Sequence, residues 1–170
     1  MTEPPDFDRL FRSVTRSAVH LEMRDDYGAS SRAFAAWREQ RPYDRSGPDA
    51  AWRALIGSVI RRGAAVQRAR IISEPVSDYI RFEYEVTPAA NLAAGEQVRW
   101  LPRQQASDLV LPGNDFWLFD DTAVLFNYFG GDGAEAGTEL RDEPAIVKLC
   151  ASAFEAVWGR AVPHEDYRPA

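Results

Sequence analysis

The feature that most constrains the fold is a strong helix pattern followed at once by a strand pattern. Apolar residues recur at helical spacing from Trp52 to Ile60, and Gly63 stands where a helix commonly ends. Ser46 is the expected N-cap of this helix. Residues 64–73 then alternate loosely between apolar and polar side chains, and Val66, Ala69, Ile71 and Ile72 suit a strand. A helix and a strand joined by so short a turn predict an α/β domain built in layers.

The alternation of helices and strands continues beyond this unit. Residues 74–95 fit a helical stripe better than a period-two strand, because a proline stands near the start and a glycine at the end. The short run at 97–102 is typical of a strand. Residues 116–128 predict two strands that reverse at Asp120 and Asp121. These elements predict a mixed sheet flanked by helices, with a parallel portion and an antiparallel hairpin at 116–128.

The last helix is expected to begin with Asp142 as its N-cap and a proline in its first turn. Its buried stripe is expected to comprise Ile146, Val147, Cys150, Phe154, Val157 and Trp158. Trp52 and Trp158 are both expected to be largely buried, each anchoring its helix against the sheet. The Gly-rich segment 130–137 is expected to be a flexible loop, because glycine disfavours regular elements. The tail from Pro163 is expected to wrap against the body or to fray.

The N-terminal part predicts a helical extension over residues 1–45. Apolar residues at helical spacing open the segment 7–25, and a second short helix is expected over 30–40. Residues 41–48 hold two prolines and a glycine, which makes them the best boundary candidate. Residues 46–170 then form the α/β domain, and the two parts are expected to make one compact unit.

The charge of the chain changes sign along its length. The net charge is −6 overall, +4 over residues 1–72 and −7 over residues 115–170. An acidic protein is a poor general nucleic-acid binder, although a local basic face can still act. Such a face is expected between Ala50 and Ser73, where no acid occurs and five arginines do: Arg53, Arg61, Arg62, Arg68 and Arg70. The alternative is that Glu74, Asp78 or the acidic C-terminal third neutralises these arginines inside the fold.

Residues able to carry out chemistry are few. The single cysteine, Cys150, lies on the apolar stripe of the last helix and is expected to be buried and inert. His20 is interpreted as a structural histidine in a helix, bonded to a neighbouring acid. His164 is placed on an exposed tail, where Glu165 and Asp166 would raise its pKa. Neither the Gly-rich loop nor the adjacent aspartates 120 and 121 match a phosphate or metal site, so no cofactor or metal is expected.

Several long strings resemble one uncharacterised family of actinomycete proteins, the domain of unknown function 6879. They are SAVHLEMRDDY, RIISEPVSDYIRFEYEVT, AGEQVRWLPR, LPGNDFWLFD, LRDEPAIVKLCASAFEAVW and PHEDYRP, and they span nearly the whole chain. Members of this family are often found beside helix-turn-helix regulators. The resemblance therefore implies a regulatory context and brings no established activity.

A more distant likeness concerns the fold. The unit WRALIGSVIRRGAAVQRARII, the hairpin FWLFDDTAVLFNYF, the Gly-rich loop and the last helix are similar to parts of phospholipase D-like domains. The likeness covers residues 48–160 and implies a phospholipase D-like half-domain. Catalytic members need a His-x-Lys pair, which the likeness places on the strand after the hairpin. This sequence has Leu125, Phe126, Asn127 and Tyr128 there, so nucleophile and phosphate clamp are both missing.

These observations predict a non-catalytic binding or sensor module that acts as accessory partner of a helix-turn-helix transcriptional regulator. Two alternatives stay open: an enzyme with an unrecognised site, such as His164 with Glu165 or Asp120, and a direct nucleic-acid binder that uses the arginine face. No run of eighteen apolar residues and no secretory signal occur, so a cytoplasmic protein without a membrane span is expected. The sequence is also compatible with a homo-oligomer.

Overall fold

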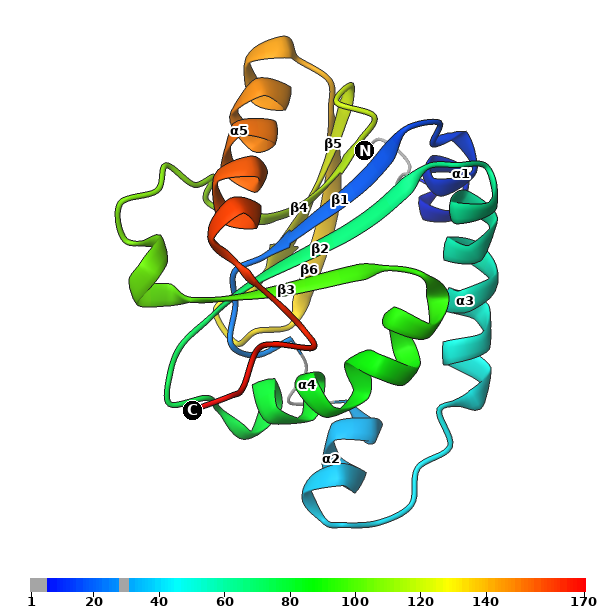
Figure 1. Cartoon of the computed structure of the whole chain (residues 1–170), viewed down its shortest axis with the longest axis vertical. Coiled ribbons are helices and arrows are strands. Elements are labelled where there is room, and N and C mark those ends of the chain that lie inside the picture. Colours follow the sequence, from blue (N-terminus) through cyan, green and yellow to red (C-terminus); the bar gives the residue numbers. More distant parts are fainter. Residues whose placement is uncertain (1–5, 28–30) are drawn as a thin grey trace.

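The computed structural model describes residues 6–27 and 31–170 and forms a mixed α/β fold around one seven-stranded sheet (Figure 1). The strands follow the order β6-β5-β4-β1-β2-β3-β7. Their bounds are β1 Ser17–Glu22, β2 Ala65–Ile72, β3 Gln97–Pro102, β4 Asp115–Phe119, β5 Ala123–Phe129, β6 Glu135–Arg141 and β7 Val162–Pro163. The helices are α1 Phe7–Ser13, α2 Arg32–Arg38, α3 Ser46–Arg61, α4 Asp78–Ala90 and α5 Pro144–Arg160, with 3-10 turns at Leu92–Ala94 and Arg103–Ala106.

The sheet has the predicted mixture of parallel and antiparallel strands. β1, β2 and β3 run parallel, joined by crossovers that contain α3 and α4. β4 pairs antiparallel with β1 and with β5, and β6 continues this meander as an edge strand. The hairpin reverses at Asp120 and Asp121, as predicted, and both residues adopt positive φ angles.

The prediction of one helix over residues 7–25 is wrong. α1 ends at Ser13, and the chain then becomes β1, which lies between β2 and β4 in the sheet. The residues before position 46 therefore supply a central strand as well as the helices α1 and α2. Helical spacing near Phe7 ends within two turns, and the residues after Arg16 pair with β2 and β4 instead. The first residue of the second expected helix, residue 30, lies outside the described residues.

Two predicted helix caps are wrong by one residue. Ser46 is the first residue of α3, and its backbone N–H donates to the carboxylate of Asp44 at 2.8 Å. At α5 the N-cap position is Glu143, and Asp142 precedes it. The glycine after α3 is confirmed in its expected role, because Gly63 has φ +86.

The Gly-rich segment is shorter as a loop than predicted. β6 begins at Glu135, so the regular strand includes Gly137, whose φ of +121 only glycine adopts readily. The tail wraps against the body: β7 pairs with β3, and the backbone N–H of Val76 donates to the carbonyl of Ala170 at 2.9 Å.

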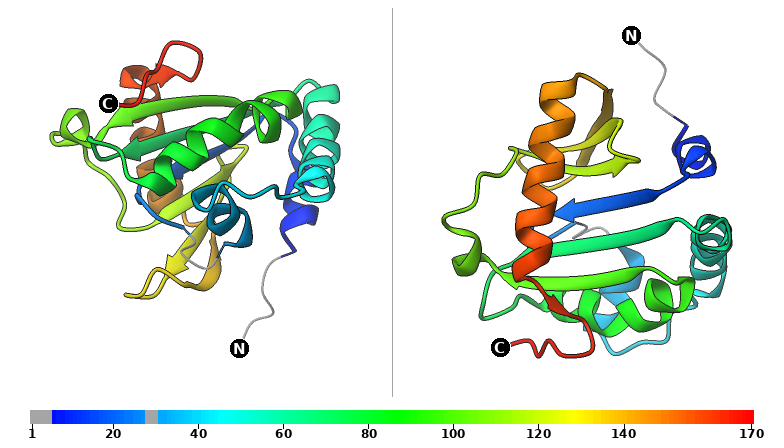
Figure 2. Two further views of the ribbon diagram at one scale, coloured as in Figure 1. Left: turned by 90° about the horizontal axis from the view of Figure 1, so that it is seen from below. Right: turned by 45° about the horizontal axis from the view of Figure 1, so that its top comes forward.

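Helices cover the two faces of the sheet unequally (Figure 2). α5 lies on one face, where Phe154 and Val157 pack against the sheet. α1, α2, α3 and α4 cover the other face in two apolar clusters. The fully buried tryptophans are Trp100 and Trp117 in the sheet. Trp52 and Trp158 were expected to be largely buried, but both are only half-buried.

Candidate functional site: an ion-pair network beneath a cavity

A row of polar side chains crosses the centre of the sheet on the face covered by α3 and α4. Side chains alternate between faces along a strand, so Leu21 and Ala69 point toward α5 while their neighbours point the other way. These neighbours are His20 opposite Arg68 and Glu22 opposite Arg70 in the parallel register. All four side chains are buried. The middle of this face is therefore charged, with an apolar cluster on either side.

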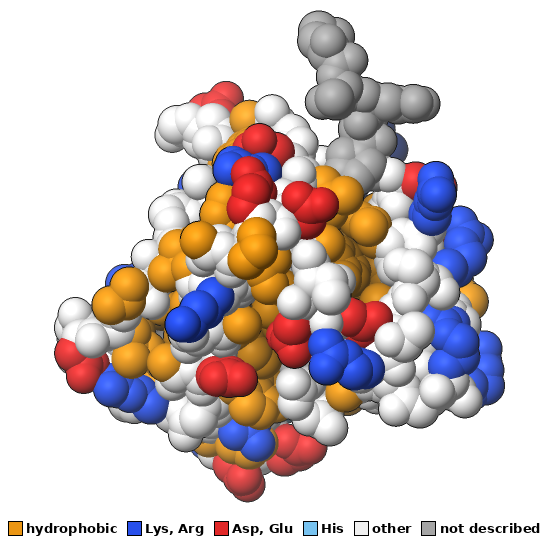
Figure 3. Space-filling model, turned by 90° about the horizontal axis from the view of Figure 1, so that it is seen from above, with side chains coloured by type: hydrophobic (Ala, Val, Ile, Leu, Met, Phe, Trp, Pro, Cys, Tyr) orange, Lys and Arg blue, Asp and Glu red, His pale blue; other side chains and the backbone are white. Residues whose placement is uncertain are grey.

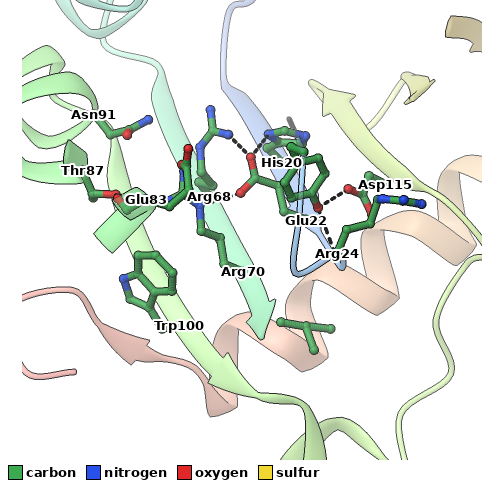
Figure 4. Close-up of polar contacts among 12 residues, drawn as sticks. His20, Glu22, Arg24, Arg68, Arg70, Glu83, Thr87, Asn91, Trp100 and Asp115 are labelled. Atoms are coloured by element: carbon green, nitrogen blue, oxygen red, sulfur yellow. Dashed lines mark hydrogen bonds and ion pairs between the residues drawn. The ribbon is translucent and has the colours of Figure 1, made fainter. Parts of the chain in front are cut away.

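The buried charged side chains form a network of ion pairs and hydrogen bonds, and Glu22 lies at its centre (Figure 4). Arg70 Nε donates to Glu22 Oε2 at 2.5 Å, and Arg68 Nη1 donates to Glu22 Oε1. Arg68 Nε also donates to Glu96 Oε1 at 2.6 Å. Each buried guanidinium thus contacts two carboxylates, which offsets much of the cost of taking these charges out of water.

α4 and the turn after it supply the outer members of the network. Arg70 donates to Glu83 Oε2 and to Thr87 Oγ1, both at 2.8 Å. Glu96 also accepts from Asn91 Nδ2 at 2.6 Å and from Trp52 Nε1 at 3.1 Å, which ties α3 to the same carboxylate. Two strands and two helices therefore hold each other in place through one set of hydrogen bonds.

Burial and the neighbouring arginines set the protonation states of Glu22 and His20. Burial acts to raise the pKa of Glu22, but Arg68 and Arg70 outweigh it and hold this pKa well below its ordinary value. Burial and the charge of Arg68 lower the pKa of His20 well below its ordinary value, so its imidazole is neutral. Its ring stacks on Trp117 at 4.3 Å between centroids, and Nδ1 lies 3.5 Å from Glu22 Oε1.

A cavity of about 470 Å³ opens above this network. The network residues Glu22, Arg68, Arg70 and Glu83 form part of its lining. Further lining comes from the start of α3, from β5 and β6, and from four aromatic side chains: Tyr27, Trp52, Tyr79 and Phe129. A concave surface with a few convergent polar groups among aromatic side chains is typical of a small-ligand site.

Tyr27 lines the cavity and is hydrogen-bonded to Asp115, which lies outside the lining. The Tyr27 hydroxyl donates to Asp115 Oδ2, and the backbone N–H of Met23 donates to Asp115 Oδ1 at 3.0 Å. Burial raises the pKa of Asp115 to about 6. Tyr79 separates this cavity from a larger one of about 710 Å³. The larger cavity contains none of the buried network, so we take the smaller one as the candidate site.

The five arginines of the predicted basic face do not lie together: two are buried and three are exposed. Arg68 and Arg70 are buried and paired with Glu22, Glu83 and Glu96 rather than with the acids expected from the sequence. Of the other three, Arg53 and Arg61 are exposed on α3, and Arg62 is exposed directly after it. In Figure 3 Lys and Arg side chains gather along the edge where α1 and α3 lie. One guanidinium there is already used, since Arg62 donates to the carbonyls of Phe11 and Val14.

Asn127 lies on β5 and lines the same cavity as the network. Its Oδ1 is buried and accepts no hydrogen bond from the described residues. Asn127 and the two predicted arginines Arg68 and Arg70 therefore line one cavity.

His164 is buried, which contradicts the prediction of an exposed tail. Its Nδ1 accepts from Trp100 Nε1 at 3.1 Å, and its ring stacks on Tyr84. Burial, followed by the charge of Arg70, lowers its pKa, although Glu165 acts in the opposite direction. Cys150 is buried as predicted, and burial raises its pKa to about 11.

Asp120, in the hairpin turn, has a structural role. The Asp120 carboxylate accepts from the backbone N–H groups of Thr15, Arg16 and Ser17 at 2.7 to 2.9 Å, which fixes the start of β1. Over residues 6–27 and 31–170, no three His, Cys, Asp or Glu side chains are grouped to hold a metal ion. In the same ranges no helix is long and apolar enough to cross a membrane.

The acidic half of the site was missed by sequence reasoning. Glu22 was hidden because its segment was interpreted as helix, and Glu83 and Glu96 lie on elements where acids usually face solvent. One signal was present: the charged residues in VHLE and QRARI alternate with apolar ones inside strands. In a central parallel strand, which is buried on both faces, such alternation indicates a buried charged row.

Comparisons with known proteins agree with the geometry of the fold. A family model described as a domain of unknown function (DUF6879) matches residues 5–169. No curated protein matches the chain. Among solved structures, the chain is similar to a phospholipase D family member, Nuc from Salmonella typhimurium, with a TM-score of 0.51 and 10% sequence identity. The match covers 95% of this chain and 88% of that one, so the phospholipase D-like fold includes the N-terminal part.

Proposed function

The chain belongs to the DUF6879 family, and we propose that it is a non-catalytic binding module, the accessory partner of a cytoplasmic helix-turn-helix regulator. The main support for the proposal is that the charged groups beneath the cavity are already paired with one another. The carboxylates and guanidinium groups beneath the cavity are committed to one another, and neither histidine lines the cavity. Arg68 and Arg70 are therefore not free to hold a phosphate, and no histidine lines the cavity to act as a nucleophile.

The choice of a protein partner is supported by an exposed apolar groove on the side of α5. Val110 is 78% exposed and Leu149 is 40% exposed, and both line a shallow cavity of about 370 Å³. Ala145 and Ala156 line it with them. Figure 3 shows hydrophobic side chains exposed over this part of the molecule. Contiguous exposed apolar surface commonly marks an interface. The family resemblance, through its genomic neighbours, supports a regulator as that partner.

Affinity capture from the source organism, followed by mass spectrometry, tests the proposal. The wild-type chain is expected to recover a helix-turn-helix regulator, and the variants Val110→Asp and Leu149→Asp are expected to lose it. Leu140→Asp is the matched control, because Leu140 is 43% exposed on the edge strand β6, away from the groove. Recovery of no regulator across growth stages, or equal loss with the control, contradicts the proposal.

A further inference from the structure

The cavity above the network carries more acid than base. Three guanidinium groups line it, those of Arg45, Arg68 and Arg70, against four carboxylates, those of Glu22, Asp49, Glu83 and Glu135. A fifth carboxylate, Glu96, lies beneath the lining and is bonded to Arg68. His20 adds no positive charge, because its pKa is lowered by burial. The electrostatic field inside this concave surface therefore favours a positive ligand.

Carboxylate oxygens that line the cavity are still free to form hydrogen bonds. Arg68 and Arg70 donate to Glu22, Glu83 and Glu96, as Figure 4 shows in part. Arg45 donates to Asp49 Oδ1 at 3.2 Å, and no second donor to this carboxylate exists in the described chain. Glu135 makes no ion pair within the described ranges. An entering anion would have to break existing pairs, whereas an entering cation finds open carboxylate oxygens.

Aromatic rings complete the lining. Tyr27, Trp52, Tyr79 and Phe129 line the cavity, and aromatic rings attract ammonium and guanidinium groups to their faces. Phe129 already binds one such group, since the Arg24 guanidinium lies 4.8 Å from its ring centroid. Burial is the main reason why the pKa values of Tyr27 and Tyr79 are raised, and nearby carboxylates raise them further.

We propose that this cavity binds an organic cation, an ammonium or guanidinium group of side-chain size, between Asp49, Glu135 and the aromatic rings. The proposal deepens the proposed function by naming the chemistry that the binding module recognises. The cation is either a free small molecule or a Lys or Arg side chain presented by the protein partner, because both offer the same group to the cavity.

Titration calorimetry with the purified full chain tests this. The probes are agmatine, which has a guanidinium and an amine but no carboxylate, an acetylated and amidated Gly-Arg-Gly peptide, and sodium phosphate. Agmatine is expected to bind with a Kd of roughly 1 mM or tighter. Asp49→Asn and Glu135→Gln are each expected to weaken it roughly tenfold, since each removes one open carboxylate. Glu155→Gln, the same charge change on exposed α5, is the matched control and is expected to bind like wild type.

The probes separate the two sources of the cation. Binding of agmatine alone supports a free small molecule, and comparable binding of the peptide supports a partner side chain. The proposal is overturned if neither cation binds at about 10 mM, if phosphate binds more tightly than agmatine, or if Glu155→Gln weakens binding as much as Glu135→Gln. Both test variants lie outside the buried network, and their thermal unfolding confirms folding. Because calorimetry needs no regulator, its outcome is independent of the capture experiment.

Discussion

At the scale of single residues, Glu22 decides whether two buried arginines are compatible with a folded sheet. Arg68 and Arg70 share its two oxygens, and removing that charge leaves both guanidinium groups short of a partner. Replacing Glu22 by Gln is therefore expected to destabilise the fold by about 3–5 kcal/mol. Urea unfolding measures this. Asp108→Asn breaks the exposed pair with Arg160 and serves as the control, with little change expected. Equal effects for the two variants would contradict a central role for Glu22.

Asp115 is expected to make stability depend on pH. Its pKa is about 6 in the folded protein against an ordinary value of 3.8, so the folded state binds its proton more tightly. Its contribution is fully present below the unfolded pKa and is lost as pH rises through 6. Relative to Asp115→Asn, the wild type should lose about 2 kcal/mol between about pH 4.5 and 7.5. Unfolding free energies of both proteins at the two pH values measure this. A constant difference would show that Asp115 titrates normally.

At the scale of elements, α5 is attached to its face of the sheet mainly through its buried stripe. Phe154 is 5% exposed in the core, whereas Trp158 is half-buried at the end of the helix, with the Arg99 guanidinium 4.3 Å from its ring centroid. Phe154→Ala is expected to cost about 3–5 kcal/mol, and Trp158→Ala clearly less. Chemical denaturation of the two variants checks the order. A larger loss for Trp158 would restore the anchoring role that the sequence suggested.

Most elements were predictable because their apolar period persists over several turns or pairs. α3, α4, α5, β2, β3 and the hairpin all have such a period. β1 was missed because α1 immediately precedes it and because charged residues occupy its inner positions. β6 was missed because glycine is usually excluded from strands, yet at Gly137 the chain adopts a positive φ beside a register shift in the ladder.

At the scale of the whole molecule, the site is formed by residues that lie far apart in the sequence. Arg68 and Arg70 were identified from a local charge pattern and Asn127 from the likeness to phospholipase D-like domains, but Glu22 lies 46 and 48 positions from the two arginines. Its partnership with them follows only from the parallel register of β1 and β2. Local patterns therefore locate charged residues, whereas the sheet decides which of them are paired and buried.

The burial of Arg68 and Arg70 in ion pairs lowers the affinity that we expect for nucleic acid. With Arg68 and Arg70 buried, only Arg53, Arg61 and Arg62 of the predicted face remain exposed, on a chain of net charge −6. Few phosphate contacts give weak, salt-sensitive binding, so no complex with duplex DNA is expected at about 0.15 M salt. Electrophoretic mobility shifts measure this. A stable complex that disappears in an Arg53→Ala, Arg61→Ala double variant would establish the alternative of a direct nucleic-acid binder.

The fold resembles that of a phospholipase D family member, and the last prediction is that the purified chain hydrolyses neither nucleic acid nor a generic phosphodiester, with or without divalent metal. Asn127 lines the cavity from β5, but an amide neither attacks phosphorus nor holds its oxygens by charge. The neighbouring Arg68 and Arg70 could supply such charge only by releasing Glu22, which would leave buried ions unpaired. Release of a chromogenic leaving group over hours measures the activity. Hydrolysis that persists through purification and is abolished by Asn127→Ala would overturn the non-catalytic assignment, while hydrolysis unaffected by that variant would indicate a contaminant.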